Sequence, residues 1–136
     1  MRLINTEDEL YNVIKKVYPD LKKSEDMFAP YDCYSEKYRA YFELKCRKIH
    51  YNLLIIERLK YERLMGIAIS RGMTPYYVCS TPQGVWRFSI VGLDLKWETQ
   101  MLPETTQFEK TNLIPKLISY VDVNKGDKLP NTFLIV

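Results

Sequence analysis

The stretch from Tyr38 to Arg47 constrains the fold most, because its side chains alternate in character. Mostly apolar side chains occupy every second position, and mostly polar ones occupy the positions between: Tyr38, Ala40, Phe42, Leu44 and Cys46 against Arg39, Tyr41, Glu43, Lys45 and Arg47. Side chains of a β-strand repeat with a period of two residues. We therefore expect a strand in which Glu43 and Lys45 are neighbours on the same face.

A short polar turn, Ser35-Glu36-Lys37, precedes this strand and predicts a hairpin. We expect the segment from Met27 to Tyr34 to form the preceding strand. An antiparallel hairpin brings Asp32 beside Glu43 and Lys45. Two carboxylates and one ammonium would then share a small volume. Such a set suits a divalent cation and the activation of a water molecule against a phosphodiester.

Composition narrows the classes of protein to consider. The chain has 136 residues, enough for one domain with one core, and no apolar run approaches the length of a membrane span. Its 3 cysteines lack CxxC spacing, which argues against a zinc site and fits a protein of the reducing cytoplasm. With 1 histidine, His50, histidine-dependent chemistry is poorly supported, whereas the net charge of +3 permits nucleic-acid binding.

The N-terminal part of the chain predicts a helix from Thr6 to Tyr18. Thr6 and Glu9 have the spacing of a capping box. Apolar residues follow at the spacing of one buried helical stripe: Leu10, Val13, Ile14 and Val17. Pro19 ends the helix.

A second helix is expected from Tyr51 to Met65, which contains neither Gly nor Pro. Its apolar start, Leu53 to Ile56, is expected to pack against the sheet. The remaining expected elements are a strand over Tyr76 to Ser80, a strand over Val85 to Val91, an extended piece over Leu93 to Met101, a loop over Pro103 to Lys110 and a short helix over Leu113 to Val121.

Pro30-Tyr31-Asp32 together with Glu43-Leu44-Lys45 resembles the signature of the PD-(D/E)xK nuclease superfamily, with Tyr31 inserted after the proline. The order of the expected elements over residues 6–91 agrees with the core of that family. The resemblance implies an α/β (α+β) fold, in which a central mixed β-sheet is flanked by helices in a restriction-endonuclease-like αβββαβ-type core. We expect a single domain over residues 1–136, with residues 92–136 as a C-terminal elaboration.

The resemblance also implies roles for the motif residues. Asp32, Glu43 and Lys45 would be catalytic, and Asp32, Glu43 and the carbonyl group of Leu44 would hold Mg²⁺ or Mn²⁺. A lysine beside two carboxylates is expected to keep its proton. Lys45 is therefore expected to stabilise negative charge on the phosphate, and a role as a base would require the metal and the phosphate to shift its protonation.

Members of this superfamily often add polar residues from their helices. The first helix here offers three acids: Glu7, Asp8 and Glu9. We favour Glu9, although it also suits the capping box. In the second helix, Glu57, Lys60 and Tyr61 are spaced to share one face. Lys60 and Tyr61 would contact DNA phosphates, and Glu57 would orient Lys45 or Lys60.

The function implied is a metal-dependent nuclease that hydrolyses DNA, a class that includes phage-encoded nucleases and junction resolvases. A resolvase would act as a homodimer, to which the apolar segments Leu53 to Ile56 and Phe133 to Val136 could contribute. Two alternatives stay open at this point. One is a non-catalytic nucleic-acid-binding domain of the same fold. The other is a structural or interaction protein, in which Asp32, Glu43 and Lys45 form a surface salt-bridge cluster.

Overall fold

The computed structural model of the protein describes residues 4–104 and 112–130. The expected tail from Phe133 to Val136 and most of the expected loop from Pro103 to Lys110 lie outside these residues. In the described part, no helix is long and apolar enough to cross a membrane.

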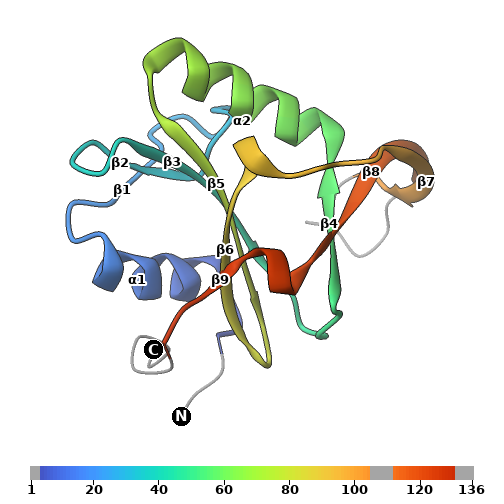
Figure 1. Ribbon diagram of the computed structural model, residues 1–136, viewed down its shortest axis with the longest axis horizontal. Helices are drawn as coiled ribbons and strands as arrows, with labels where there is room; N and C mark the ends of the chain where they lie inside the picture. The colour runs from blue at the N-terminus through green and yellow to red at the C-terminus, as the bar shows by residue number, and fades with distance from the viewer. Residues whose placement is uncertain (1–3, 105–111, 131–136) are drawn as a thin grey trace.

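A mixed six-stranded sheet lies between two helices, α1 (Glu7–Val17) and α2 (Arg58–Arg71) (Figure 1). Its strands, in their order across the sheet, are β1 (Lys22–Lys23), β2 (Cys33–Ser35), β3 (Ala40–Cys46), β5 (Thr74–Thr81), β6 (Gly84–Ser89) and β9 (Asp127–Lys128). The neighbouring strands are antiparallel except for β3 and β5, which run parallel. This parallel pair forms the centre of the sheet.

The alternation along β3 gives the sheet two different faces. Ala40, Phe42 and Leu44 belong to one buried cluster with α1. Tyr41 belongs to a second cluster with α2, on the opposite face. Because Glu43 and Lys45 have the same parity as Tyr41, they leave β3 on the face that α2 covers.

The first helix forms as predicted. The side chain of Thr6 caps α1, and its Oγ1 accepts the Glu9 N–H at 3.1 Å. The stripe of Leu10, Val13 and Ile14 is buried against the sheet. The cap and the stripe together fix how the start of α1 meets the end of β3.

A second, antiparallel sheet stands beside α2, to the right in Figure 1. It contains β4 (Leu53–Glu57), β8 (Leu113–Asp122) and β7 (Glu98–Pro103) in that spatial order. Two 3₁₀ turns, η1 (Ile90–Gly92) and η2 (Val123–Lys125), follow β6 and β8. Leaving aside the short β1, the order α1-β2-β3-β4-α2-β5 confirms the predicted αβββαβ core.

The segment from Leu53 to Ile56 is a strand, so the prediction that it begins the second helix was wrong. It pairs antiparallel with β8 along its whole length. Leu54 and Ile56 are buried, whereas Leu53 is 52% exposed, which is the alternation of a strand. Adjacent β-branched residues favour this choice. Helix α2 begins only at Arg58, after the apolar run has ended.

The segment from Leu113 to Val121 is also a strand, and the predicted short helix was wrong. Its apolar and β-branched residues lie in β8, which pairs with β7 on one side and β4 on the other. In a helix over this segment, Pro115 would lie in the first turn, where proline is tolerated. It lies beyond the end of β4, which pairs only with residues 118–122 of β8. Proline is tolerated at a strand position that lacks a second neighbour.

The predicted strand from Met27 to Tyr34 is mostly a loop, because β2 covers only Cys33–Ser35. Side chains here bond to the local backbone in place of a neighbouring strand. Ser24 Oγ donates to the Asp26 carbonyl group, and Asp26 Oδ1 accepts the Phe28 N–H at 2.9 Å. Such bonds favour turns over strands. The loop over residues 24–32 therefore approaches β3 without extending the sheet.

The phenylalanines of the core and of this loop should respond differently to truncation. Phe42 is fully buried and packs on Tyr18 and Tyr76, with ring centroids 4.8 and 5.5 Å away. Phe42→Ala should lower the free energy of unfolding by about 3–5 kcal/mol. Phe28 is 75% exposed, so Phe28→Ala should change it by less than about 0.5 kcal/mol. Urea denaturation measures both values, and equal losses would contradict this packing.

Candidate active site

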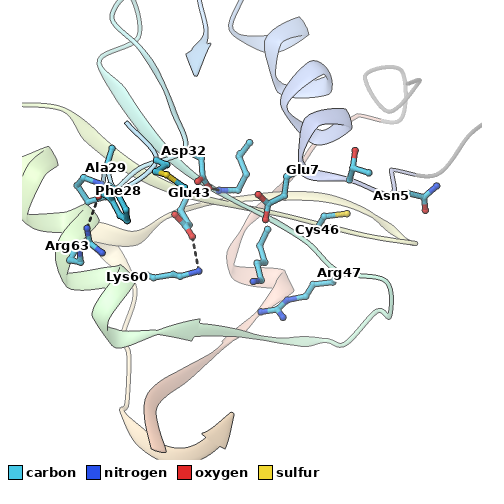
Figure 2. Close-up of a pocket in the computed structure, with 15 residues that line it drawn as sticks. Asn5, Glu7, Phe28, Ala29, Asp32, Glu43, Cys46, Arg47, Lys60 and Arg63 are labelled. Carbon is cyan, nitrogen blue, oxygen red and sulfur yellow. Dashed lines mark hydrogen bonds and ion pairs between the residues drawn. The ribbon is translucent and has the colours of Figure 1, made fainter. Parts of the chain in front are cut away.

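A cavity of about 640 Å³ opens where β3 extends beyond β2 (Figure 2). Its walls come from α1, the loop over residues 24–32, β3 and α2. Charged side chains of both signs line it: Glu7, Asp32, Glu43, Lys45, Arg47, Lys60 and Arg63. The fold thus gathers the three residues of the predicted motif in one cavity, as the hairpin argument required.

Asp32 is held by the backbone of β3. Its own N–H donates to the Phe42 carbonyl group at 2.8 Å, and its Oδ2 accepts the Leu44 N–H at 2.7 Å. The N–H and C=O of one strand residue point to the same side of the strand. The Leu44 carbonyl group therefore faces the edge of β3 at which the Asp32 carboxylate lies. The Asp32 carboxylate and the Leu44 carbonyl group, both possible metal ligands, therefore lie at the same edge.

Glu43 meets a second lysine, which reaches it from α2. Lys60 Nζ lies 3.6 Å from Glu43 Oε1 and 3.7 Å from Glu57 Oε2. Figure 2 marks the contact between Lys60 and Glu43 with a dashed line. Glu57 also pairs with Lys116, at 2.7 Å. Two acids and two bases thus form a chain of ion pairs from the cavity to β8.

The predicted helical face of Glu57, Lys60 and Tyr61 does not form as such, because Glu57 is the last residue of β4. Glu57 and Lys60 still meet across the junction between β4 and α2. The Tyr61 ring packs against Trp97, with a centroid distance of 5.3 Å. Tyr61 lines a smaller adjoining cavity that also includes Glu43 and Lys45. Lys60 therefore lies in the cavity with Asp32, Glu43 and Lys45, whereas Tyr61 lines the smaller adjoining cavity.

Glu7, and not Glu9, is the acid of α1 that lines the cavity in the described structure. Glu9 Oε1 accepts from the Asn5 N–H and the Thr6 hydroxyl group, so this side chain serves the helix cap. Burial and the nearby charge of Asp32 raise the pKa of Glu7. Glu7 is therefore the carboxylate of the first helix that belongs to the cavity. The capping box was the signal in the sequence, because it already assigned Glu9 to the helix cap.

The carboxylates of the cavity resist ionisation. Burial raises the pKa of Asp32, although the Leu44 N–H favours its charged form. Burial and the charge of Asp32 raise the pKa of Glu43 to about 7. Removing a carboxylate from water and placing another beside it both disfavour the anion. A cavity with these acids has an electrostatic reason to bind a cation.

Lys45 differs from the prediction that two carboxylates would hold its proton. Burial lowers its pKa, and the positive charges of Lys60 and Arg47 lower it further. Among the described residues, no ion pair joins Lys45 to a carboxylate. Burial alone would lower the pKa of Lys60 as well, but Glu43, Glu57 and Asp32 together raise it. Lys60 has therefore taken the ion pair that the sequence suggested for Lys45.

The donor atoms in the cavity fit a hard divalent cation. Asp32, Glu43 and the Leu44 carbonyl group offer oxygen ligands, the kind that Mg²⁺ and Mn²⁺ prefer. The raised pKa values of Asp32 and Glu43 indicate negative charge that the protein compensates incompletely. No group of three or more His, Cys, Asp and Glu side chains at metal-binding spacing occurs within residues 4–104 and 112–130. A third ligand beside Asp32 and Glu43 would have to be of another kind, such as the Leu44 carbonyl group.

Sequence reasoning missed Arg63, although it is spaced three positions after Lys60 on α2 and so shares its side of the helix. Its Nη2 donates to the Phe28 carbonyl group at 2.9 Å. In Figure 2, Phe28 and Arg63 lie at one end of the cavity, and Asn5 and Arg47 lie at the other. Positive side chains thus stand at both ends, with the acids between them.

Comparison with known proteins identifies the fold. No model of a protein family matches this chain, and no curated protein matches it. Among solved structures, the chain is similar to Hjc, a Holliday junction resolvase of the archaeal hyperthermophile Archaeoglobus fulgidus. The similarity has a TM-score of 0.60 at 14% sequence identity and covers 95% of this chain and 96% of that one. It supports the predicted restriction-endonuclease-like fold.

The raised pKa of Glu43 predicts how stability depends on pH. Its ordinary pKa of 4.5 rises to about 7 on folding, so the folded state binds this proton more tightly than the unfolded state. Stability that Glu43 contributes at low pH is thus lost as the pH rises towards and through 7. In EDTA at pH 8, Glu43→Gln should raise the free energy of unfolding by on the order of 1–3 kcal/mol, and by less at pH 5.

Urea denaturation at both pH values measures the effect. The matched control is Glu62→Gln, because Glu62 is an acid of α2 whose side chain is 52% exposed. If Glu43→Gln gained the same free energy of unfolding at pH 5 and at pH 8, the pKa of Glu43 would not be raised in the folded protein.

Proposed function

We propose that this protein is a metal-dependent nuclease that hydrolyses DNA phosphodiester bonds in the cavity of Asp32, Glu43 and Lys45. The observation that carries the proposal is the convergence of these residues. The Asp32 carboxylate is fixed at the edge of β3 by the Leu44 N–H. Glu43 and Lys45 line the same cavity from the next positions of that strand. The similar fold of a junction resolvase supports the same reading.

Asp32, Glu43 and the Leu44 carbonyl group would hold Mg²⁺ or Mn²⁺, with Glu7 in the same cavity. Such an ion, when bound, offsets charge on the phosphate oxygens and lowers the pKa of a water molecule. The role of Asp32 begins before any ion binds, because its bond to Leu44 fixes one carboxylate oxygen. The same side chain is also hydrogen-bonded to Glu43, so the two acids are held next to each other.

Lys45 would act on the reacting phosphate itself. Its ammonium group has three N–H donors and can offset the charge that develops on the phosphorus oxygens. Lys60, Arg47 and Arg63 would hold the backbone phosphates on either side, because phosphate contacts position a nucleic acid without reading its sequence. Lys60 has a second role in the free protein, where its ion pair with Glu43 compensates a buried acid.

We propose the four-way DNA junction as the first substrate to test, since the similar structure is that of a Holliday junction resolvase. Resolving a junction requires cuts in two strands. A chain with one cavity of this kind would supply both cuts as a homodimer with two-fold symmetry.

Metal binding should be visible as a rise in melting temperature with added Mn²⁺. At a Mn²⁺ concentration 100 times the dissociation constant, the gain in stability is about 2.7 kcal/mol. The gain should be smaller at pH 6 than at pH 8, because the acids must lose their protons to bind the ion. Asp32→Asn and Glu43→Ala should abolish the shift, whereas Glu62→Ala should keep it. A shift that survives both cavity variants would place the ion elsewhere.

Cleavage tests the reaction directly. Supercoiled, linear, single-stranded and four-way-junction DNA would be incubated with Mg²⁺, Mn²⁺ or EDTA. Lys45→Ala should slow cleavage by about 10²–10³-fold, because it removes one charge that acts on the transition state. Lys125→Ala, an exposed lysine of η2, is the matched control. Metal-independent binding without cleavage would indicate a non-catalytic DNA-binding domain, and neither binding nor cleavage would indicate an interaction protein.

A further inference from the structure

Two large apolar side chains stand in solvent at the rim of the cavity. Met27 is 88% exposed and Phe28 is 75% exposed, more than any other large hydrophobic residue in the described part of the chain. Both line the cavity that contains Asp32 and Glu43. Large apolar groups at a polar site indicate a binding surface, because water covers them at a free-energy cost.

The loop that presents this pair is tied down on several sides. The Phe28 N–H donates to Asp26 Oδ1 at 2.9 Å, and the Phe28 carbonyl group accepts from Arg63 Nη2 at 2.9 Å. The Ser24 N–H donates to the Asp32 carbonyl group at 2.9 Å. Both backbone polar groups of Phe28 are thus bonded to side chains. A side chain on a fixed backbone loses less entropy when it binds a ligand than one on a mobile loop.

The surroundings of Phe28 identify the class of ligand. Arg63 is bonded to the Phe28 backbone, and Lys60 is spaced one helical turn before Arg63 on α2. An aromatic ring beside such cations matches a nucleotide, which has a negative phosphate and an apolar base. Figure 2 shows Phe28 and Arg63 on the same side of Glu43. A strand that places a phosphate at Asp32 and Glu43 and leaves the cavity at the Arg63 end would pass Phe28 with a neighbouring nucleotide.

We propose that Met27 and Phe28 form a stacking platform for an unpaired base next to the bond that is cut. The inference rests on the proposed nuclease function and adds a substrate class to it. A base inside a continuous duplex has both faces covered by its neighbours, so it offers no face to Phe28. A base at a fork, a junction or a strand end offers one. The protein should therefore bind DNA with an unstacked base in preference to uninterrupted duplex.

Binding of fluorescent DNA tests the platform apart from cleavage. The probes are a continuous duplex and a forked duplex of the same sequence, with 2-aminopurine at the branch of the fork. Binding is measured in EDTA and in Ca²⁺. Phe28→Ala should weaken binding to the fork by about tenfold, the scale of one lost stack between a base and an aromatic ring. The same variant should leave duplex binding within about twofold of wild type, since a paired base offers it no face.

The control and rescue variants make the result specific. Ile69→Ala removes another exposed apolar side chain, 69% exposed on α2, and should not change binding to either DNA. Phe28→Trp should restore fork binding, because it restores an aromatic face. Quenching of the 2-aminopurine by wild type and its loss in Phe28→Ala would place the ring against the base.

Three results would overturn the platform. The first is a Phe28→Ala variant that binds both DNAs as Ile69→Ala does, and the second is one that weakens both DNAs equally. The third is a change from dimer to monomer in Phe28→Ala, measured by sedimentation, which would assign the pair to an interface between copies.

Failure of the platform and failure of the nuclease can be told apart. Normal metal-dependent cleavage by Phe28→Ala, with unchanged fork binding, would leave the nuclease standing and remove the platform. Phe28-dependent fork binding without cleavage of any DNA would remove the nuclease and leave the platform. A wild-type protein that binds no DNA would overturn both.

Discussion

The hydrogen bond from the Leu44 N–H to the Asp32 carboxylate is the contact on which the site depends. Strand β2 begins at Cys33, and the backbone N–H of Asp32, the residue before it, donates to the Phe42 carbonyl group of β3. The Asp32 side chain accepts the next N–H on this edge of β3, that of Leu44, where a longer strand would have bonded. On its other edge, β3 is fixed by seven paired positions of the parallel strand β5. The Asp32 carboxylate thus lies where the pairing of β2 with β3 stops and the cavity opens. Because the Leu44 side chain packs into the cluster with α1, its neighbours Glu43 and Lys45 point to the face that α2 covers, where Lys60 reaches Glu43.

Holding acids in such a cavity has an energetic consequence for the rest of the protein. Burial and the nearby charge of Asp32 oppose the ionisation of Glu43. Lys60 partly compensates this, because it forms ion pairs with both Glu43 and Glu57. Lys60 is half exposed, so its compensation is screened by solvent and incomplete. Lys60 adds a like charge beside Lys45 and so lowers its pKa, although Glu7 and Glu57 partly oppose this effect. A site that is electrostatically unsatisfied when empty is one that favours a ligand of opposite charge, at some loss of stability.

The sequence was sufficient where one short-range rule decided the outcome. The alternation over Tyr38 to Arg47 fixed β3 and its faces, and the hairpin turn then brought Asp32 to Glu43 and Lys45. It was insufficient where tertiary partners decided. Leu53 to Ile56 can be buried in a helix or in a strand, and pairing with β8 selects the strand that its β-branched residues favour. Pro115 is compatible with a helix start or with a strand position that lacks a second neighbour. The protonation of Lys45 depended on Lys60, which lies on a different element.

The arrangement also bears on how the protein would select a substrate. The described elements form two sheets and two helices, and each wall of the cavity belongs to the αβββαβ core or to the loop over residues 24–32. If the protein binds DNA as proposed, the positive side chains at both ends of the cavity would attract any nucleic-acid backbone, because phosphate contacts are independent of sequence. Discrimination must then come from the shape of the strand that enters. The feature best placed to sense shape is the loop that carries Phe28, since Arg63 ties that loop to the helix that also supplies Lys60. Helix α2 would thus position both the loop that selects the substrate, through Arg63, and the catalytic acid Glu43, through Lys60.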